Sequence, residues 1–205
     1  MKFYLSSYRL GNEAKKLVSL LPKNKKAAVI ANAVDDVLPS IRIEKVKREL
    51  EDLKKIGIEA EEIDLRNYFG KKELLRKKLS EYGMVWVRGG NTYILRRAYD
   101  YSGFDSLLKE KLTDKKFVYA GYSAGICILS LSLKGLDIVD DPNIVPKKYK
   151  KEIIWDGLGF INYNISPHYR SNHPESALVE KEVQYCINNK ILFKALRDGE
   201  VIILE

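Results

Sequence analysis

The sequence predicts an α/β protein, a three-layer sandwich in which a mostly parallel central sheet lies between two layers of helices. Two observations support this fold class. Short apolar runs alternate with longer amphipathic runs along most of the 205 residues, as expected when each strand is followed by a covering helix. The apolar runs are nearly continuous, as in strands buried on both faces. Because a chain of this length can bury one full core, we expect residues 1–205 to form a single domain.

The first part of the chain gives this alternation in order. Amphipathic spacing predicts helices, and the long lysine- and glutamate-rich segment places an apolar residue on one face at every turn. The predicted strands are 2–8, 26–33, 59–65, 84–90 and 116–123, and the predicted helices are 12–21, 39–57, 71–83 and 92–112, the last as one or two helices.

In the last quarter of the chain, the regular alternation of strands and helices changes. Residues 157–169 are expected to form a strand and residues 173–189 a helix that opens at Pro174. Residues 192–205 are expected to form a C-terminal β-hairpin with Asp198 and Gly199 in its turn. A hairpin of this kind commonly completes an otherwise parallel sheet.

Composition limits the function classes. The net charge of +8 comes mostly from lysines interleaved with glutamates, which is typical of solvated helix faces, so no nucleic-acid partner is expected. The apolar runs are shorter than a bilayer span and the N-terminal segment lacks the apolar core of a signal peptide, so we expect a cytoplasmic protein with no membrane partner. Cys127 and Cys186 fit core positions, with spacing for neither a metal site nor a disulfide framework.

One corner between a strand and a helix has an unusual sequence. Gly121, Tyr122, Ser123, Ala124 and Gly125 follow the pattern Gly-x-Ser-x-Gly between a predicted strand and a predicted helix. This is the context of a nucleophile elbow, in which a sharp turn exposes the serine hydroxyl beside free backbone N–H groups. A tight packing joint with glycines on both sides is the alternative.

A second corner follows the strand at 84–90. Its glycines, which include Gly90, permit close approach of a substrate and could supply an oxyanion donor together with Ala124. Asn91 and Thr92 also suit a helix N-cap, so capping alone would explain this segment.

A nucleophilic serine needs a base and an orienting acid. His168 directly follows a predicted strand, whereas His173 precedes Pro174 and fits a helix entry, so His168 is favoured as the base. Hydrolases with an elbow place the acid between the serine and the histidine, and the acids there are Asp137, Asp140, Asp141, Glu152 and Asp156. The turn-like segment 140–143 is favoured, although either aspartate could instead cap that turn.

Four ordered stretches carry a family resemblance: "RGGNTYILRRA", "YAGYSAG", "DDPNIV" and "GLGFINYNISPHY". Together they resemble dipeptidase E, the aspartyl dipeptidase, and its serine peptidase relatives. The resemblance runs over most of the chain and implies the flavodoxin-like fold of class I glutamine amidotransferases. It implies that Ser123 is the nucleophile, His168 the base and Asp141 the acid, with Asp140 as the alternative. The oxyanion donors fall on the N–H groups of Gly90 and Ala124.

The resemblance also leaves the substrate side chain open, because the segment after His168 differs from the family pattern. Arg170 is a candidate for binding an acidic substrate group, and Asn91 a second candidate contact to substrate. The expected function is a serine peptidase that hydrolyses small peptides without cofactor or metal, and a homodimer is compatible with it. The alternatives are a hydrolase of another acyl substrate, such as an esterase or a cyanophycinase-like enzyme, and a non-catalytic binding relative.

Overall fold

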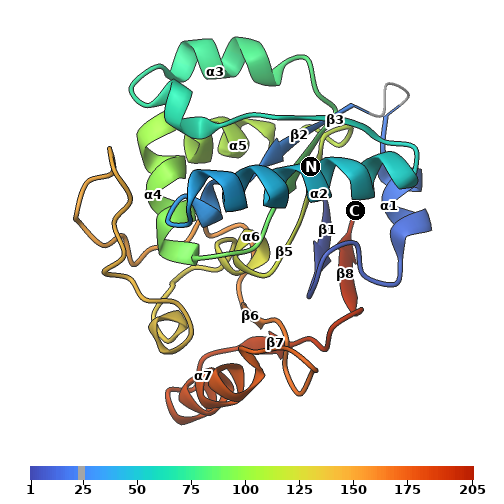
Figure 1. Cartoon of the computed structure of the whole chain (residues 1–205). Helices are drawn as coiled ribbons and strands as arrows, with labels where there is room; N and C mark the ends of the chain where they lie inside the picture. Colours follow the sequence, from blue (N-terminus) through green and yellow to red (C-terminus); the bar gives the residue numbers. More distant parts are fainter. Residues whose placement is uncertain (23–25) are drawn as a thin grey trace.

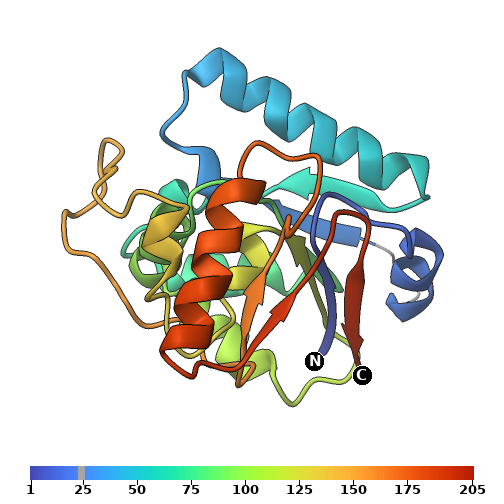
Figure 2. The ribbon, with the colours of Figure 1, turned by 90° about the horizontal axis from the view of Figure 1, so that it is seen from below.

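A six-stranded sheet forms the centre of the protein, whose computed structural model describes residues 1–22 and 26–205. The strands lie in the order β3-β2-β4-β5-β1-β8. All neighbours are parallel except β8, which runs antiparallel beside β1 and brings the two chain ends together (Figure 2). Their bounds are β1 Lys2–Ser6, β2 Lys26–Ile30, β3 Glu59–Glu62, β4 Met84–Val87, β5 Val118–Tyr122 and β8 Val201–Leu204.

Helices cover both faces of this sheet (Figure 1). On one face, α1 (Ala14–Leu20) and α2 (Pro39–Lys55) pack on Trp86 and other apolar side chains of the strands. On the other face, the sheet residues pack against α3 (Lys72–Leu79), α4 (Thr92–Ser102) and α5 (Phe104–Lys111). Alternate residues of each strand pack into the apolar cores on the two faces of the sheet, because successive side chains of a strand point to opposite faces. The predicted three-layer sandwich with a mostly parallel sheet is therefore confirmed.

Short elements fill the connections and lie near the carboxyl ends of the strands. They are η1 (Asn32–Val34), η2 (Leu65–Tyr68), α6 (Ala124–Cys127) and η3 (Leu136–Ile138). In the part of the chain that the structure describes, no helix has both the length and the apolar character needed to cross a bilayer.

A small second sheet lies beside the main one. Strand β6 (Asn164–Ser166) pairs in parallel with β7 (Phe193–Ala195), and α7 (Ser176–Asn188) connects them (Figure 1). Both strands of the expected C-terminal hairpin are present, with Asp198 and Gly199 between them. They pair with different partners, however, because β7 adds to β6 and β8 adds to β1. The turn therefore bridges the two sheets.

The glycines of the elbow allow α6 to approach the backbone of β4. A Cβ atom on Gly121 would lie 2.6 Å from the carbonyl oxygen of Val87, and one on Gly125 would lie 2.4 Å from the same atom. Both distances are too short for a real contact. The pattern Gly-x-Ser-x-Gly thus also serves the packing of two neighbouring strand ends, and this packing fixes where Ser123 stands.

We predict that Gly125→Ala lowers the free energy of unfolding by about 1–3 kcal/mol, the usual cost of overpacking a rigid site. Urea denaturation followed by circular dichroism measures the loss. Gly70→Ala is the control, because nothing lies within 4 Å of the added Cβ, so its loss comes only from the positive φ of +70°, which Gly125 does not have. A loss at Gly125 no larger than that at Gly70 would contradict the steric explanation.

Candidate active site

Ser123 occupies a strained backbone conformation between β5 and α6. Its φ of 50° and ψ of −123° lie outside the regions that a residue with a side chain normally adopts. Such strain costs about 1–3 kcal/mol and concentrates at functional sites. Within the described residues, the hydroxyl of Ser123 makes no hydrogen bond, and the residue lines a cavity of about 250 Å³. The side chain of Ser123 thus lines the cavity, and its hydroxyl is available to a ligand there.

The loop after β4 lies against this turn. A Cβ on Gly89 would lie 2.7 Å from the Cβ of Ser123, and one on Gly90 (φ 143°) would lie 2.4 Å from the carbonyl oxygen of Ala33. Only glycine fits either position. The absence of side chains brings the backbone of Gly90 and the start of α6 at Ala124 to neighbouring strand ends, where backbone N–H groups can face a substrate oxygen.

His168 lies in the same cavity and has a carboxylate partner. The residue is buried, follows β6 and has a φ of 63°. Its Nδ1 lies 2.6 Å from Oδ1 of Asp198. Since a carboxylate accepts a hydrogen bond, Nδ1 carries the proton and Nε2 has a free lone pair, which is the tautomer that a general base requires.

Two serines hold this pair in place. The hydroxyl of Ser7 donates to Oδ1 of Asp198 at 3.0 Å and accepts a hydrogen bond from the backbone N–H of His168 at 2.9 Å. The hydroxyl of Ser171 accepts from the backbone N–H of Asp198 at 2.8 Å. The end of β1 and the loops after β6 and β7 are thereby fastened to one another around the imidazole.

A second histidine stacks on the first. The rings of His168 and His173 have centroids 3.7 Å apart and planes only 7° apart. Tyr8 meets both rings edge-on, at 5.7 and 5.5 Å. Nδ1 of His173 accepts from the backbone N–H of Glu175 at 3.3 Å, so this ring has no carboxylate partner of the kind His168 has. Of the two rings, the one with a carboxylate at hydrogen-bond distance is therefore that of His168.

Burial sets the protonation state of the base. It lowers the pKa of His168 below the usual 6.5, and the positive charge of a protonated His173 would lower it further, while the hydrogen bond to Asp198 partly offsets both effects. The net direction is downward. The imidazole is consequently neutral at physiological pH and able to accept a proton.

The carboxylate at hydrogen-bond distance from Nδ1 of His168 is that of Asp198, and not that of Asp141 or Asp140. Asp141 is exposed, and its Oδ1 accepts from the backbone N–H of Asn143 at 2.8 Å. Oδ2 of Asp140 accepts from the backbone N–H of Thr92 at 2.8 Å. Asp141 thus caps the turn 140–143, as the sequence left open, whereas Asp140 bonds to the start of α4, and neither accepts from Nδ1 of the imidazole.

The two candidate substrate contacts are also engaged elsewhere. Asn91 caps α4, accepting from the N–H groups of Tyr93 and Ile94, and its amide donates to the backbone carbonyl of Asp141 at 2.9 Å. Arg170 is exposed and lies 3.8 Å from Glu180. Neither residue lines the cavity that holds Ser123 and His168.

Basic residues line part of the cavity wall, and sequence reasoning missed them. They are Lys45 and Arg48 of α2 and Arg88 after β4. Burial and the neighbouring charges of Arg88 and Arg48 lower the pKa of Lys45, so positive charge is in local excess. An anionic group of a ligand would relieve this repulsion.

Glu49 is a buried carboxylate that organises this wall. It is 1% exposed, and its oxygens accept from Nε1 of Trp86 at 3.0 Å and from the hydroxyl of Tyr122 at 2.7 Å. Nε of Arg88 lies 3.2 Å away. Glu49 therefore ties α2 to β4, which ends at Val87, and to the residue before Ser123. A glutamate at a buried position of a helix rich in lysine and glutamate leaves no distinct signal in the sequence.

One group of side chains has the composition of a metal site. Ligand atoms of His168, His173 and Glu175 lie within 4.8 Å of one another. The two rings are nearly parallel, however, so their in-plane lone pairs do not converge on one point. One ring would have to rotate away from the observed stack before both could bind an ion.

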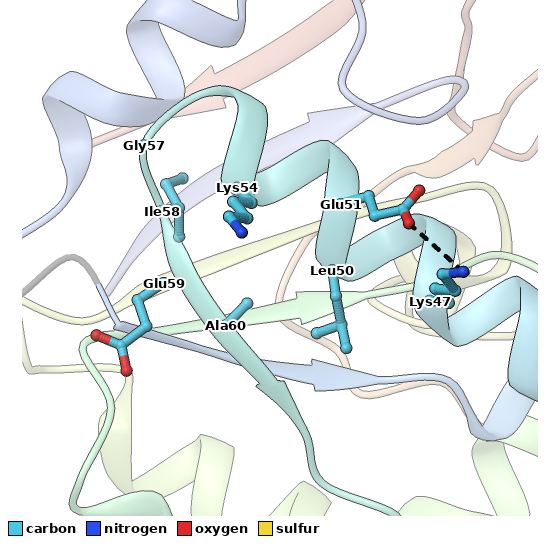
Figure 3. A pocket seen from close by; sticks show the side chains of 8 residues that line it. All are labelled: Lys47, Leu50, Glu51, Lys54, Gly57, Ile58, Glu59 and Ala60. Carbon is cyan, nitrogen blue, oxygen red and sulfur yellow. Dashed lines mark ion pairs between the residues drawn. The ribbon is translucent and has the colours of Figure 1, made fainter.

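A larger cavity of about 430 Å³ lies elsewhere, between α2 and the edge strand β3 (Figure 3). Its walls are mainly Leu50, Ile58 and Ala60, with an ion pair between Lys47 and Glu51 at one side. It contains no nucleophile and no histidine. The smaller cavity at Ser123 is therefore the candidate active site, despite its size.

The comparisons with known proteins show the family and the fold of this chain. The model of peptidase family S51 matches residues 8–205. The chain belongs to peptidase family S51. Among curated relatives of this S51 member, the uncharacterized peptidase Lmo0363 of Listeria monocytogenes is 29% identical over 154 residues, which cover 75% of this chain and 68% of the relative. The uncharacterized peptidase Lin0382 of Listeria innocua is 28% identical over 153 residues, 75% of this chain and 67% of the relative.

Solved structures share the fold of this S51 member. A candidate peptidase E protein from Listeria monocytogenes EGD-e has a TM-score of 0.74 at 21% identity, covering 100% of this chain and 98% of that one. A peptidase from an acI-B1 Actinobacterium has a TM-score of 0.66 at 14% identity, covering 100% and 83%. The expected family and its fold are thereby confirmed.

We predict that NMR titration gives His168 a pKa below 6.5, because burial disfavours the imidazolium. Asp198→Asn should lower it further, since the carboxylate is the group that raises it. The chain has only two histidines, so a His173→Gln variant assigns the signals. A pKa of His168 that rises in Asp198→Asn would contradict the observed pairing.

Proposed function

We propose that this S51 member is a serine-type peptidase that cleaves short peptides through an acyl-enzyme. The observation that carries the proposal is the shared cavity in which a strained, displayed Ser123 meets a buried His168 whose Nδ1 is held by Asp198. Serine, histidine and carboxylate in this relation form the constellation of serine hydrolases, which is recognised by geometry rather than by chain order.

Each residue then has a role in the reaction. Nε2 of His168 takes the proton of the Ser123 hydroxyl as the oxygen attacks the scissile carbonyl. The N–H groups of Gly90 and Ala124 stabilise the oxyanion, and Asp198 stabilises the imidazolium. Nε2 returns the proton to the departing amine. A water molecule, deprotonated by the same nitrogen, releases the acyl group and restores Ser123.

The cavity favours a short substrate. At about 250 Å³ it is at the small end of ligand sites. The positive charges of Lys45 and Arg48 suit the C-terminal carboxylate of a short peptide. That carboxylate reaches them only if it lies close to the scissile bond, which requires a peptide of few residues. Dipeptides are thus the substrates to screen first.

Hydrolysis of another acyl substrate is the second candidate, since the same three residues would cleave an ester. We prefer a peptide substrate because its carboxylate can bind the positive charges of Lys45 and Arg48, whereas a neutral ester has no group that binds them. A library of dipeptides, with simple esters beside it, separates the two functions.

We predict that Ser123→Ala lowers turnover by about a million-fold while the protein stays folded. The hydroxyl has no hydrogen-bond partner among the described residues, so its removal leaves no buried polar group unpaired. Dipeptide hydrolysis and labelling by a fluorophosphonate probe measure the effect, and thermal unfolding checks the fold. An unlabelled wild-type protein would instead favour a non-catalytic binding role.

We predict that Asp198→Asn lowers turnover by about ten-thousand-fold, because an amide can stabilise the wrong imidazole tautomer. Asp141→Asn is the matched control and should change turnover little, since Asp141 is exposed and bonds locally to Asn143. Steady-state assays of both variants on one dipeptide decide the assignment. A larger loss at Asp141 than at Asp198 would restore the acid expected from the resemblance.

A further inference from the structure

A buried polar network lies just beyond the carboxyl end of β2. Its centre is the carboxylate of Asp35, whose side chain is 0% exposed. Oδ1 of Asp35 accepts from Nε of Arg42 at 2.6 Å, and Oδ2 accepts from Nδ2 of Asn32 at 2.8 Å and from the hydroxyl of Tyr149 at 2.5 Å. Burial and the negative charge of Asp35 raise the pKa of Tyr149, so its hydroxyl keeps the proton that it donates. None of these four residues lines the cavity of Ser123.

The network holds both ends of the short helix η1, because Asn32 is its first residue and Asp35 directly follows it. The side chain of Asn32 also reaches the connection after β3, where its Oδ1 accepts from the N–H of Leu65 at 3.2 Å and its Nδ2 donates to Oδ1 of Asp64 at 3.1 Å. A buried ion pair such as that of Arg42 and Asp35 contributes little net stability, because removing both charges from water is costly. The consequence of the network is therefore geometric: it fixes the position of η1.

Helix η1 in turn holds the loop that carries Gly90. The N–H of Arg88 donates to the carbonyl oxygen of Ile30 at 3.0 Å, and the N–H of Asn91 donates to the carbonyl oxygen of Ala33 at 2.8 Å. These hydrogen bonds lie on either side of Gly90 in the sequence. A Cβ on Gly90 would lie only 2.4 Å from the carbonyl oxygen of Ala33, so the backbone of Gly90 lies directly against η1.

The N–H groups of Gly90 and Ala124 have no acceptor among the residues that the structure describes. Val34, the last residue of η1, lines the candidate active site together with Gly90 and Ser123. An N–H group stabilises an oxyanion only if it is oriented toward the place where that charge develops, and a displacement of 1 Å can cost about 100-fold in rate. The position of η1 consequently sets how well the N–H of Gly90 can act.

We propose that Asn32, Asp35, Arg42 and Tyr149 are positioning residues, which act through η1 to orient the N–H of Gly90 toward the oxyanion. The proposal rests on the proposed serine peptidase function, in which Gly90 is an oxyanion donor, and adds the buried residues on which this donor depends. The base is held by other contacts, those of Ser7 and Ser171 with the pair of His168 and Asp198. A change in the network should therefore impair the oxyanion donor and leave the base unchanged.

The variant Tyr149→Phe tests the proposal, because it removes one hydrogen bond to Asp35 and keeps the buried ring. The phosphoryl oxygen of a fluorophosphonate probe takes the place of the oxyanion, so the rate at which the probe labels Ser123 should fall about 10-fold, and in Asp35→Asn about 100-fold. With a dipeptide that wild type hydrolyses, kcat should fall by the same factors and KM should stay the same. The pKa of His168, measured by NMR, should keep its wild-type value in both variants.

Matched variants separate this role from a loss of stability. Tyr101→Phe is the control for Tyr149→Phe, because the two rings are 6.3 Å apart but the hydroxyl of Tyr101 accepts from the N–H of Lys150 and bonds to no residue of η1. It should keep the wild-type labelling rate and kcat. Asp198→Asn acts on the base and should lower the pKa of His168, which shows that the NMR measurement responds. Thermal unfolding confirms that each variant is folded, and Tyr149→Phe stands alone as the test should Asp35→Asn fail to fold.

The outcomes distinguish the two proposals. A wild-type protein that the probe does not label overturns the proposed function and this inference with it. If wild type is labelled but folded Tyr149→Phe keeps the wild-type rate, the positioning role is refuted while the hydrolase stands. The same conclusion follows if slower labelling is accompanied by a changed pKa of His168, or if KM rises while kcat is unchanged.

Discussion

The close approach of α6 and β5 to the end of β4 is the constraint on which the site depends. Side chains are absent at Gly89, Gly121 and Gly125 because a Cβ at any of them would collide with Val87 or Ser123. This contact places the nucleophile turn beside the backbone of the neighbouring strand. Without it, the two corners that line the cavity would be separated by at least the width of a side chain. The strain at Ser123 persists because the packing around it leaves no relaxed alternative.

A buried carboxylate reinforces this arrangement from the opposite face of the sheet. Glu49 bonds to Trp86 and Tyr122, whose strands carry the two corners, and it also neutralises Arg88. Removing such a partner leaves buried donors unpaired, which costs more than the hydrogen bonds contribute. The helix α2 thus contributes to the candidate active site in two ways. It fixes the strand ends through Glu49 and supplies Lys45 and Arg48 to the cavity wall.

The sequence predicted the sheet, its covering helices and the family, because apolar periodicity and the ordered glycine-rich corners depend on local residues. Its limits are clear at particular positions. Residues 157–169 were expected to be one strand, but only Asn164–Ser166 forms one, since the N–H groups of residues 158–160 bond to carbonyl groups of residues 128–130 instead. The sequence predicts Asp198 only as a turn residue before Gly199. It lies beside His168 because β7 pairs with β6 and β8 with β1, so the turn between them crosses from one sheet to the other. A hydrogen-bond partner that depends on how distant strands pair cannot be recognised from the neighbouring residues in the sequence.

The position of Asp198 also explains how the acidic groups near Ser123 are distributed. Because the carboxylate beside His168 arrives from the C-terminal turn, Asp140 bonds to the N–H of Thr92 instead and lines a cavity of about 20 Å³ with Ser123, Glu175 and Glu182. The basic residues come from α2 and the end of β4, whereas the acidic ones come from η3's following loop and from α7 and the turn before it. Glu175 also lines the cavity that Lys45, Arg48 and Arg88 line, so groups of both charges surround the candidate active site. Charged groups in such an arrangement contribute more to the orientation of a ligand than to its affinity.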